Sequence, residues 1–172
     1  AMDAIGKFLA DRNFNFNDIT IAKRSAINKI GDSWIQEDSK EPTTLMEWES
    51  LVPKMEIWLD VERDEIHYVA NIIPTLKWRG GKLGTRLAFL PKDISKLFAD
   101  YREEYFAARR AETAKKNVEI RLYPKNLCEF LEKNLNAYFS IKTYILDAAR
   151  EETEIPQETP FEMECFIDNP LK

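Results

Sequence analysis

The feature that most constrains the fold is a change in hydrophobic spacing at Pro53. Before this proline, apolar residues recur every three or four positions, which predicts amphipathic helices. From Lys54 onward they alternate with polar residues, the period of a β-strand with one buried face. A chain of 172 residues that changes period in this way is expected to form an α+β fold.

The N-terminal part, 3–52, is predicted to be helical. Residues 3–11 predict a short helix, and residues 19–36 predict a longer amphipathic one. Thr44 followed three positions later by Glu47 is a capping-box pattern, which predicts another short helix.

Within 54–90, four short runs alternate between apolar and polar residues. They are separated by turn-forming residues and cover 54–60, 66–73, 76–78 and 83–89. This pattern predicts a four-stranded antiparallel meander.

The C-terminal part, 92–150, is predicted to contain two long helices. The first follows Pro91 and runs to about Lys116, and the second covers about 125–150, with a short strand at 118–123 between them. Residues 151–172 form an acidic tail with a possible edge strand near its end.

The complete prediction is a single α+β domain over residues 3–168. It consists of an antiparallel sheet of four or five strands, with N-terminal helices and two long C-terminal helices packed on it.

Residues 75–92 form the most distinctive local segment. They contain five basic residues and no acidic residue, whereas the whole chain has a net charge of −5. Three of the five glycines also fall in this segment. A basic, glycine-containing hairpin on an acidic protein predicts a contact with an anionic partner.

Alternation along the predicted strands places Lys77, Arg79 and Arg86 on one outer face of the sheet, with Lys82 at the turn. The predicted binding residues are Lys77, Arg79, Lys82 and Arg86, with Trp58 as a stacking residue. Cations that pair with phosphates and a ring that stacks on a base together make a single-strand binding surface. The favoured hypothesis is non-catalytic binding of nucleic acid, DNA or RNA and single-stranded in preference, or of another polyanion.

Two other interpretations stay open. The cations and Trp58 can belong to an ordinary sheet face that is solvated or covered by the N-terminal helices. Alternatively, the chain is a protein-interaction module or a homo-oligomer that uses the last helix and the acidic tail. The last helix carries more aromatic residues than one face can bury: Phe130, Tyr138, Phe139 and Tyr144.

Catalysis has the weakest support, so we predict no catalytic residues, no metal ligands and no cofactor. GGKLGT lacks the GxxxxGK[ST] spacing of a phosphate-binding loop. His67 is the only histidine, which leaves a histidine-based triad or zinc site without partners. A metal-dependent nuclease, or a fragment of a larger nucleic-acid enzyme, is the third hypothesis. Restriction-type nucleases are expected to carry the pattern ExK, whereas Glu119 and Arg121 form ExR. A cluster of acids falls in a predicted turn: Asp60, Glu62, Asp64 and Glu65.

Cysteine use and hydropathy predict a cytoplasmic protein with no membrane partner. Cys128 and Cys165 lie in apolar contexts that are typical of buried free thiols in a reducing compartment. No apolar run approaches the about 18 residues of a membrane span. The N-terminus also lacks the layout of a signal peptide.

The element order of residues 54–106 is similar to that of a known class of single-strand binders. The predicted meander followed by RLAFLPKDISKLFADY resembles the sheet-then-helix unit of Whirly- and PUR-type proteins. This resemblance is one of element order, it identifies no family, and it implies single-strand binding by the sheet.

Overall fold

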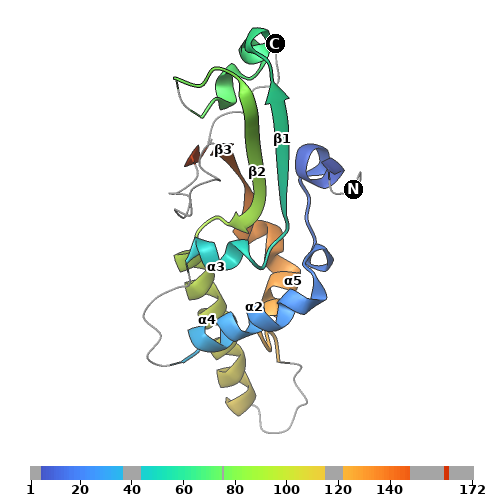
Figure 1. Ribbon diagram of the computed structural model, residues 1–172. Coiled ribbons are helices and arrows are strands. Elements are labelled where there is room, and N and C mark those ends of the chain that lie inside the picture. The colour runs from blue at the N-terminus through green and yellow to red at the C-terminus, as the bar shows by residue number, and fades with distance from the viewer. Residues whose placement is uncertain (1–4, 37–43, 75, 115–121, 148–160, 163–172) are drawn as a thin grey trace, which may run out of the picture. The chain divides into compact units, whose positions relative to one another are not determined.

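The structure is a computed structural model that describes residues 5–36, 44–74, 76–114, 122–147 and 161–162. The chain divides into two compact units (Figure 1). The helical unit comprises 1–53 and 89–140, and the sheet unit comprises 54–88 and 141–172.

The helical unit contains four α-helices and two short helical turns among its described residues. α5 packs against α2, α4 and η2 (Figure 1). The elements are η1 (Lys7–Asp11), η2 (Phe16–Asp18), α2 (Ile21–Trp34), α3 (Leu45–Glu49), α4 (Ile94–Ala114) and α5 (Leu127–Tyr138).

Aromatic side chains dominate the core of the helical unit. Trp34, Trp48 and Tyr101 are fully buried, and their rings contact one another or Phe139. Tyr101 also meets Phe130 edge-on, with ring centroids 5.6 Å apart. These contacts join α2, α3, α4, α5 and the end of a strand around one apolar interior.

Both ends of α5 are satisfied by side chains. At its start, the Asn126 side chain accepts a hydrogen bond from the Glu129 backbone N–H. At its end, Lys92 Nζ donates to the carbonyls of Asn136 and Ala137 at 2.8 and 3.1 Å. A cation suits this end of the helix dipole, so Lys92, a member of the basic segment, has a structural role.

The sheet has the strand order β1-β2-β3-β4. β1 (Lys54–Val61) pairs antiparallel with β2 (Gly81–Pro91), and β3 (Phe139–Asp147) pairs antiparallel with the two-residue β4 (Phe161–Glu162). β2 and β3 belong to both units, because Phe89 and Phe139 lie in the helical unit.

Short 3-10 turns, η3 (Arg63–Tyr68) and η4 (Ala70–Ile72), connect β1 to β2. The strand predicted at 66–73 is therefore wrong. Glu62 and Glu65 form a reciprocal capping box, in which the Glu62 N–H donates to Glu65 Oε2 at 3.1 Å. This local capping starts a helical turn where the alternation of side chains had predicted a strand.

The predicted arrangement of four or five strands with two long C-terminal helices is also wrong, because the sheet consists of three long strands and the two-residue β4, and the long helix over 125–150 does not form. Residues 54–90 contribute two strands instead of four, and the third long strand, β3, lies where a helix over 125–150 was expected. α5 ends at Tyr138. After it, β-branched residues occupy every second position: Ile141, Thr143 and Ile145. β-Branched side chains at every second position favour a strand once a partner strand is present.

Other predictions meet the structure in part. Thr44 precedes α3 at the predicted position, but its side chain makes no capping hydrogen bond. Most of the strand predicted at 118–123 and most of the acidic tail lie outside the described residues, and residues 122 and 123 are not in a strand. The single domain over 3–168 stays a prediction.

α2 and α5 approach closely at Gly31. A Cβ built on Gly31 would lie 2.6 Å from the Cβ of Leu127 and 3.3 Å from the hydroxyl of Tyr101. Leu127 and Tyr101 are both fully buried. A side chain at position 31 would therefore force the two helices apart.

Gly31→Ala should lower the free energy of unfolding by about 1–2 kcal/mol. Overpacking costs about 1–3 kcal/mol, and the better helix propensity of alanine offsets about 1 kcal/mol of it. Urea unfolding monitored by tryptophan fluorescence measures the change. Gly6→Ala is the matched control, because no atom lies within 4 Å of a Cβ built there. Equal stability of Gly31→Ala and wild type would contradict the close approach.

Candidate functional site

Oppositely charged residues face each other across β1 and β2. The register sets Glu56 opposite Arg86 and Asp60 opposite Lys82. Alternation places these four side chains on one face of the sheet. The two predicted cations that lie on β2 therefore both have a carboxylate of β1 as cross-strand neighbour.

Arg86 forms an ion pair with Glu56. Its Nε donates to Glu56 Oε1 at 2.8 Å, and a terminal guanidinium nitrogen lies 2.7 Å from the same oxygen. The side chains are 18% and 34% exposed, respectively. An anionic ligand would have to compete with Glu56 for this guanidinium, so Arg86 is better explained as part of the hairpin than as a binding residue.

Trp58 packs within the sheet unit. It lies opposite Gly84 in the register, and a Cβ built on Gly84 would lie 2.6 Å from the Trp58 ring and 2.8 Å from the Cβ of Leu146. The absence of a side chain at Gly84 therefore makes room for the indole, which is only partly exposed. Trp58 is not a freely exposed stacking surface.

Lys77 and Arg79 lie in the connection that leads into β2, because the strand predicted at 76–78 does not form. Arg79 donates to the backbone carbonyls of Leu76 and Trp78 at 3.1 and 3.4 Å. The expectation that Lys77, Arg79 and Arg86 share one sheet face is therefore wrong. Lys77 and Arg79 lie outside any strand, so their side chains do not follow the alternation that fixes Arg86 on one face of β2.

The turn after Arg79 depends on two glycines. Gly80 and Gly81 have φ of 104° and 102°, a region that side chains disfavour. A Cβ on Gly80 would also lie 2.9 Å from the Val61 carbonyl oxygen and 3.6 Å from the backbone nitrogen of Arg63. The connection thus returns to the end of β1 at Gly80.

Three of the predicted cations stay exposed. We call Lys77, Arg79 and Lys82 the basic loop. Within the part of the chain that the structure describes, no ion pair involves any of them. They fall within six consecutive positions that contain no acidic residue.

The structure adds two residues that sequence reasoning missed. Arg63 is exposed at the start of η3, and its backbone lies next to Gly80. Tyr68, at the end of η3, is 80% exposed. Sequence reasoning missed Tyr68 because alternation placed it on the inward face of a predicted strand, where its side chain would be buried.

The described residues offer no arrangement for metal or triad chemistry. No group of three or more His, Cys, Asp or Glu side chains in these ranges could hold a metal ion. His67 is exposed, and its ring centroid lies 3.9 Å from that of Tyr68. The acids near it cap or surround η3, as Glu62 and Glu65 show.

Cys128 is a buried free thiol. Burial raises its pKa to about 11, so the thiol stays protonated and unreactive near neutral pH. Its Sγ donates to the Arg24 carbonyl at 3.3 Å.

In the described ranges, none of the helices has both the length and the apolar character to cross a bilayer.

The aromatic side chains that suggested a partner surface are mostly internal. Phe130, Phe139 and Tyr144 are 0%, 2% and 7% exposed. Tyr138 is half-buried, and its hydroxyl donates to Asp100 Oδ2 at 2.8 Å. The predicted surplus of exposed aromatic side chains is therefore wrong. These rings belong to a helix followed by a strand, which directs them differently from one long helix.

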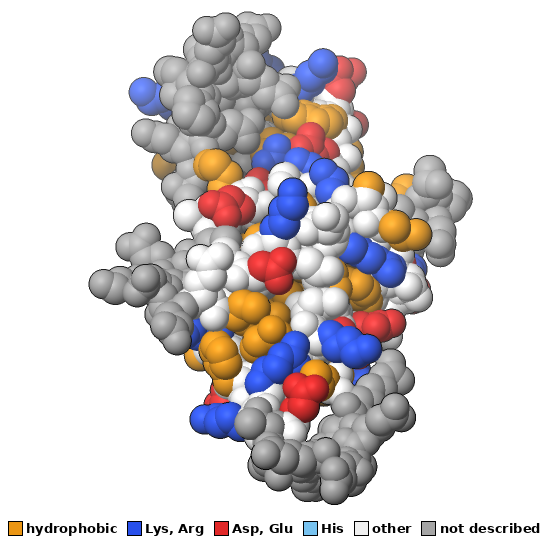
Figure 2. Space-filling view, turned by 90° about the horizontal axis from the view of Figure 1, so that it is seen from below, with side chains coloured by type: hydrophobic (Ala, Val, Ile, Leu, Met, Phe, Trp, Pro, Cys, Tyr) orange, Lys and Arg blue, Asp and Glu red, His pale blue; other side chains and the backbone are white. Residues whose placement is uncertain are grey.

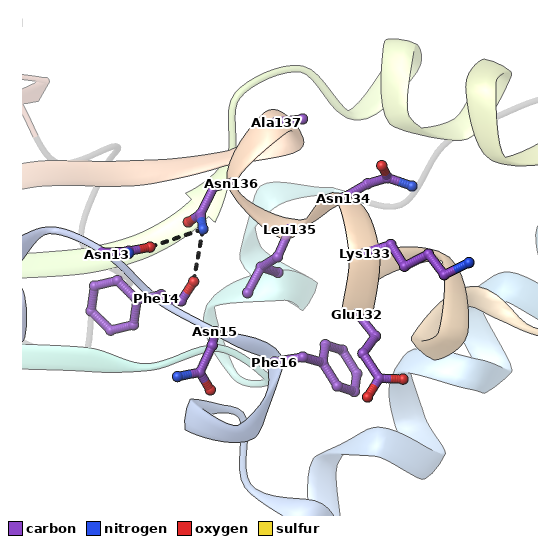
Figure 3. Close-up of a pocket in the computed structure, with 10 residues that line it drawn as sticks. All are labelled: Asn13, Phe14, Asn15, Phe16, Glu132, Lys133, Asn134, Leu135, Asn136 and Ala137. Carbon is purple, nitrogen blue, oxygen red and sulfur yellow. Dashed lines mark hydrogen bonds between the residues drawn. The ribbon is translucent and has the colours of Figure 1, made fainter.

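The helical unit has a pocket of about 250 Å³ between residues 13–16 and 132–137 (Figure 3). Asn136 Nδ2 donates to Asn13 Oδ1 and to the Phe14 carbonyl at 3.1 and 2.9 Å. Asn134 Nδ2 donates to the Phe130 carbonyl at 3.2 Å. The Asn136 carboxamide therefore holds the N-terminal segment to α5, whereas the Asn134 bond to Phe130 lies within the helix.

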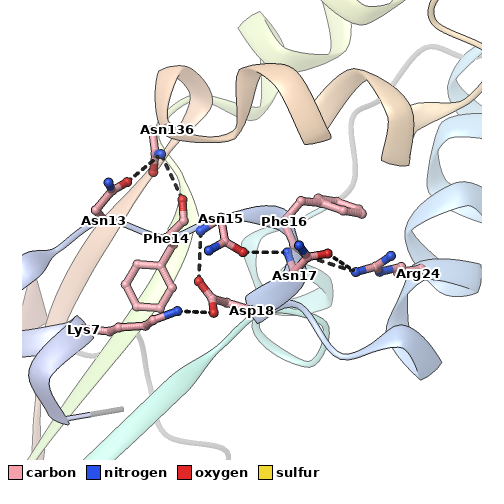
Figure 4. A network of polar contacts seen from close by, with 9 residues as sticks. All are labelled: Lys7, Asn13, Phe14, Asn15, Phe16, Asn17, Asp18, Arg24 and Asn136. Atoms are coloured by element: carbon pink, nitrogen blue, oxygen red, sulfur yellow. Dashed lines mark hydrogen bonds and ion pairs between the residues drawn. The ribbon is translucent and has the colours of Figure 1, made fainter. Parts of the chain in front are cut away.

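A polar network continues from this pocket along the N-terminal segment (Figure 4). Asp18 pairs with Lys7 and accepts a hydrogen bond from the Asn15 backbone N–H. Burial alone would raise the pKa of Asp18, but the hydrogen bonds from Lys7 and Asn15 outweigh it and lower the pKa below 3.8.

Charges of both signs are mixed on the face of the molecule shown in Figure 2. Basic and acidic side chains alternate there, with small hydrophobic groups between them. This face therefore presents no extended region of one sign for an anionic partner.

A scan against protein-family models, a search of curated proteins and a search of solved structures each found no significant match to this chain. The resemblance to Whirly- and PUR-type units has lost its basis as well, because it depended on a four-stranded meander that the structure lacks.

The Glu56–Arg86 pair should contribute a coupling free energy of about 0.2–1 kcal/mol, as cross-strand ion pairs do. A double-mutant cycle with Glu56→Gln and Arg86→Gln, measured by urea unfolding, gives this quantity. The cycle with Asp60→Asn and Lys82→Gln is the control and should give a smaller coupling. No coupling between Glu56 and Arg86 at low salt would contradict the ion pair.

Asp18→Asn should destabilise the protein at neutral pH and less so in acid. A lowered folded pKa contributes stability that is fully present above the unfolded value of 3.8 and is lost as the pH falls through the folded pKa. Unfolding titrations of wild type and variant at about pH 7 and about pH 3 measure the difference. A difference that does not shrink in acid would contradict this role of Asp18.

Proposed function

We propose that this chain binds nucleic acid or another polyanion without catalysis, through the basic loop. The observation that carries the proposal is that Lys77, Arg79 and Lys82 are exposed and form no ion pair among the described residues. Three exposed cations close together in sequence can each neutralise a phosphate and release a counterion.

The glycines beside the loop support the same proposal. Gly80 and Gly81 carry no side chains, so a phosphate can approach the backbone closely at these positions. Arg63 adds a fourth cation nearby. The carboxylate of Asp60 is also the cross-strand neighbour of Lys82. We therefore expect weak binding, with a dissociation constant of about 10⁻⁴–10⁻⁶ M at physiological salt.

The protein-interaction alternative has less support. Its argument was an excess of exposed aromatic side chains on a long last helix, and Phe130, Phe139 and Tyr144 are buried. The acidic tail that it also used lies mostly outside the described residues. We place the proposed binding in the cytoplasm, where the free thiol of Cys128 would remain reduced.

The direct test is the salt dependence of binding to labelled single-stranded DNA and RNA, measured by fluorescence anisotropy. The wild type should bind with a log–log salt slope of about −2, the value for three neutralised phosphates on a single strand. The triple variant Lys77→Ala, Arg79→Ala, Lys82→Ala should lose most of this slope and affinity, because it lacks the three charges.

A charge-matched control separates the loop from net charge. Lys23→Ala, Lys29→Ala and Arg110→Ala together remove the same three charges from exposed positions on α2 and α4. This variant should bind like wild type. No binding by wild type at about 50 mM salt would overturn the proposed function, as would equal losses in the two triple variants.

A further inference from the structure

The two most exposed large hydrophobic side chains of the described residues lie in the connection between β1 and β2. Leu76 is 90% exposed and Tyr68 is 80% exposed. Both belong to the sheet unit, as does the basic loop. Large exposed apolar side chains in the same connection as exposed cations suit a ligand that carries both charged and apolar groups.

Leu76 and Tyr68 each make a contact within the same connection. Arg79 donates to the Leu76 carbonyl, which ties the guanidinium to this part of the loop. The His67 ring lies against Tyr68 at an interplanar angle of 40° and supports the phenol ring while most of it stays exposed. Lys77 directly follows Leu76 in the chain.

We infer that the ligand of the basic loop is single-stranded nucleic acid, whose unpaired bases stack on Tyr68 and contact Leu76. This inference rests on the proposed function, since the cations of the loop would hold the phosphates. An exposed aromatic ring in the same connection as exposed cations suits a single strand, because the bases of a single strand expose their faces, whereas the bases of a duplex are stacked on one another. Tyr68 thus takes the role that the sequence had suggested for Trp58.

The test compares two labelled probes of equal charge: an oligothymidylate of about 16 nucleotides and an abasic phosphodiester strand of the same length. Wild type should bind the oligothymidylate more tightly. Tyr68→Ala should weaken binding to the oligothymidylate by about 5- to 100-fold, the range for loss of one base–aromatic stack, and leave the abasic strand unaffected. Tyr68→Trp should retain tight binding.

Two controls guard against unfolding and non-specific effects. Tyr68→Ala should keep the wild-type circular dichroism and melting temperature, because an exposed ring contributes little to packing. Ile21→Ala removes a hydrophobic side chain that is 78% exposed in the helical unit, and it should bind both probes like wild type.

The remaining outcomes distinguish this inference from the proposed function. If wild type binds both probes equally and Tyr68→Ala changes neither, the stacking inference is overturned and polyanion binding stands. Equal losses on both probes would show that Tyr68 only shapes the loop, which also overturns it. Binding of neither probe at low salt overturns both. Phosphatidylserine vesicles serve as a third probe. If Tyr68→Ala weakens binding to these vesicles alone, the loop is a membrane contact and the inference is overturned.

Discussion

The described structure depends above all on the aromatic core of the helical unit. Ring contacts run from Phe14 through Phe89, Phe139 and Trp48 to Trp34. Burying each such side chain stabilises the fold by about 1.5–3 kcal/mol. Phe89 and Phe139 belong to β2 and β3, and their centroids are 5.6 Å apart. The end of β2 and the start of β3 are therefore neighbours in this core, and the two strands are adjacent in the sheet.

The candidate site lies in a part of the chain that this core does not constrain. β1 and β2 are aligned by backbone pairing, by the Glu56–Arg86 ion pair and by the fit of Trp58 over Gly84. The connection between them instead exposes Tyr68, Lys77 and Arg79. Residues that hold the hairpin together are thereby distinct from residues that stay exposed in the connection, although both groups occur in one short stretch of sequence.

Sequence reasoning succeeded where structure is decided locally and failed where it depends on distant partners. The alternation from Lys54 predicted β1, and helical spacing predicted α2 and α4. Sequence reasoning assigned the residues of β3 to a helix, because the apolar residues there also fit a helical period as long as no partner strand is known. For the site, the positive charges were evident from composition, but the partner of Arg86 lies 30 positions away in the sequence. Residue spacing contains no information about that pairing.

The sequence by itself determined the α+β class, the positions of the locally patterned helices and the basic segment 75–92, because spacing and charge are properties of neighbouring residues. Only the tertiary structure decided which strands pair, which cations have a carboxylate opposite them and which aromatic ring stays exposed. These outcomes depend on register, since a shift of one residue moves every side chain of a strand to the other face. Gly84, Trp58 and Leu146 come from three separate strands and meet where a side chain at position 84 would not fit, so this packing favours the observed register.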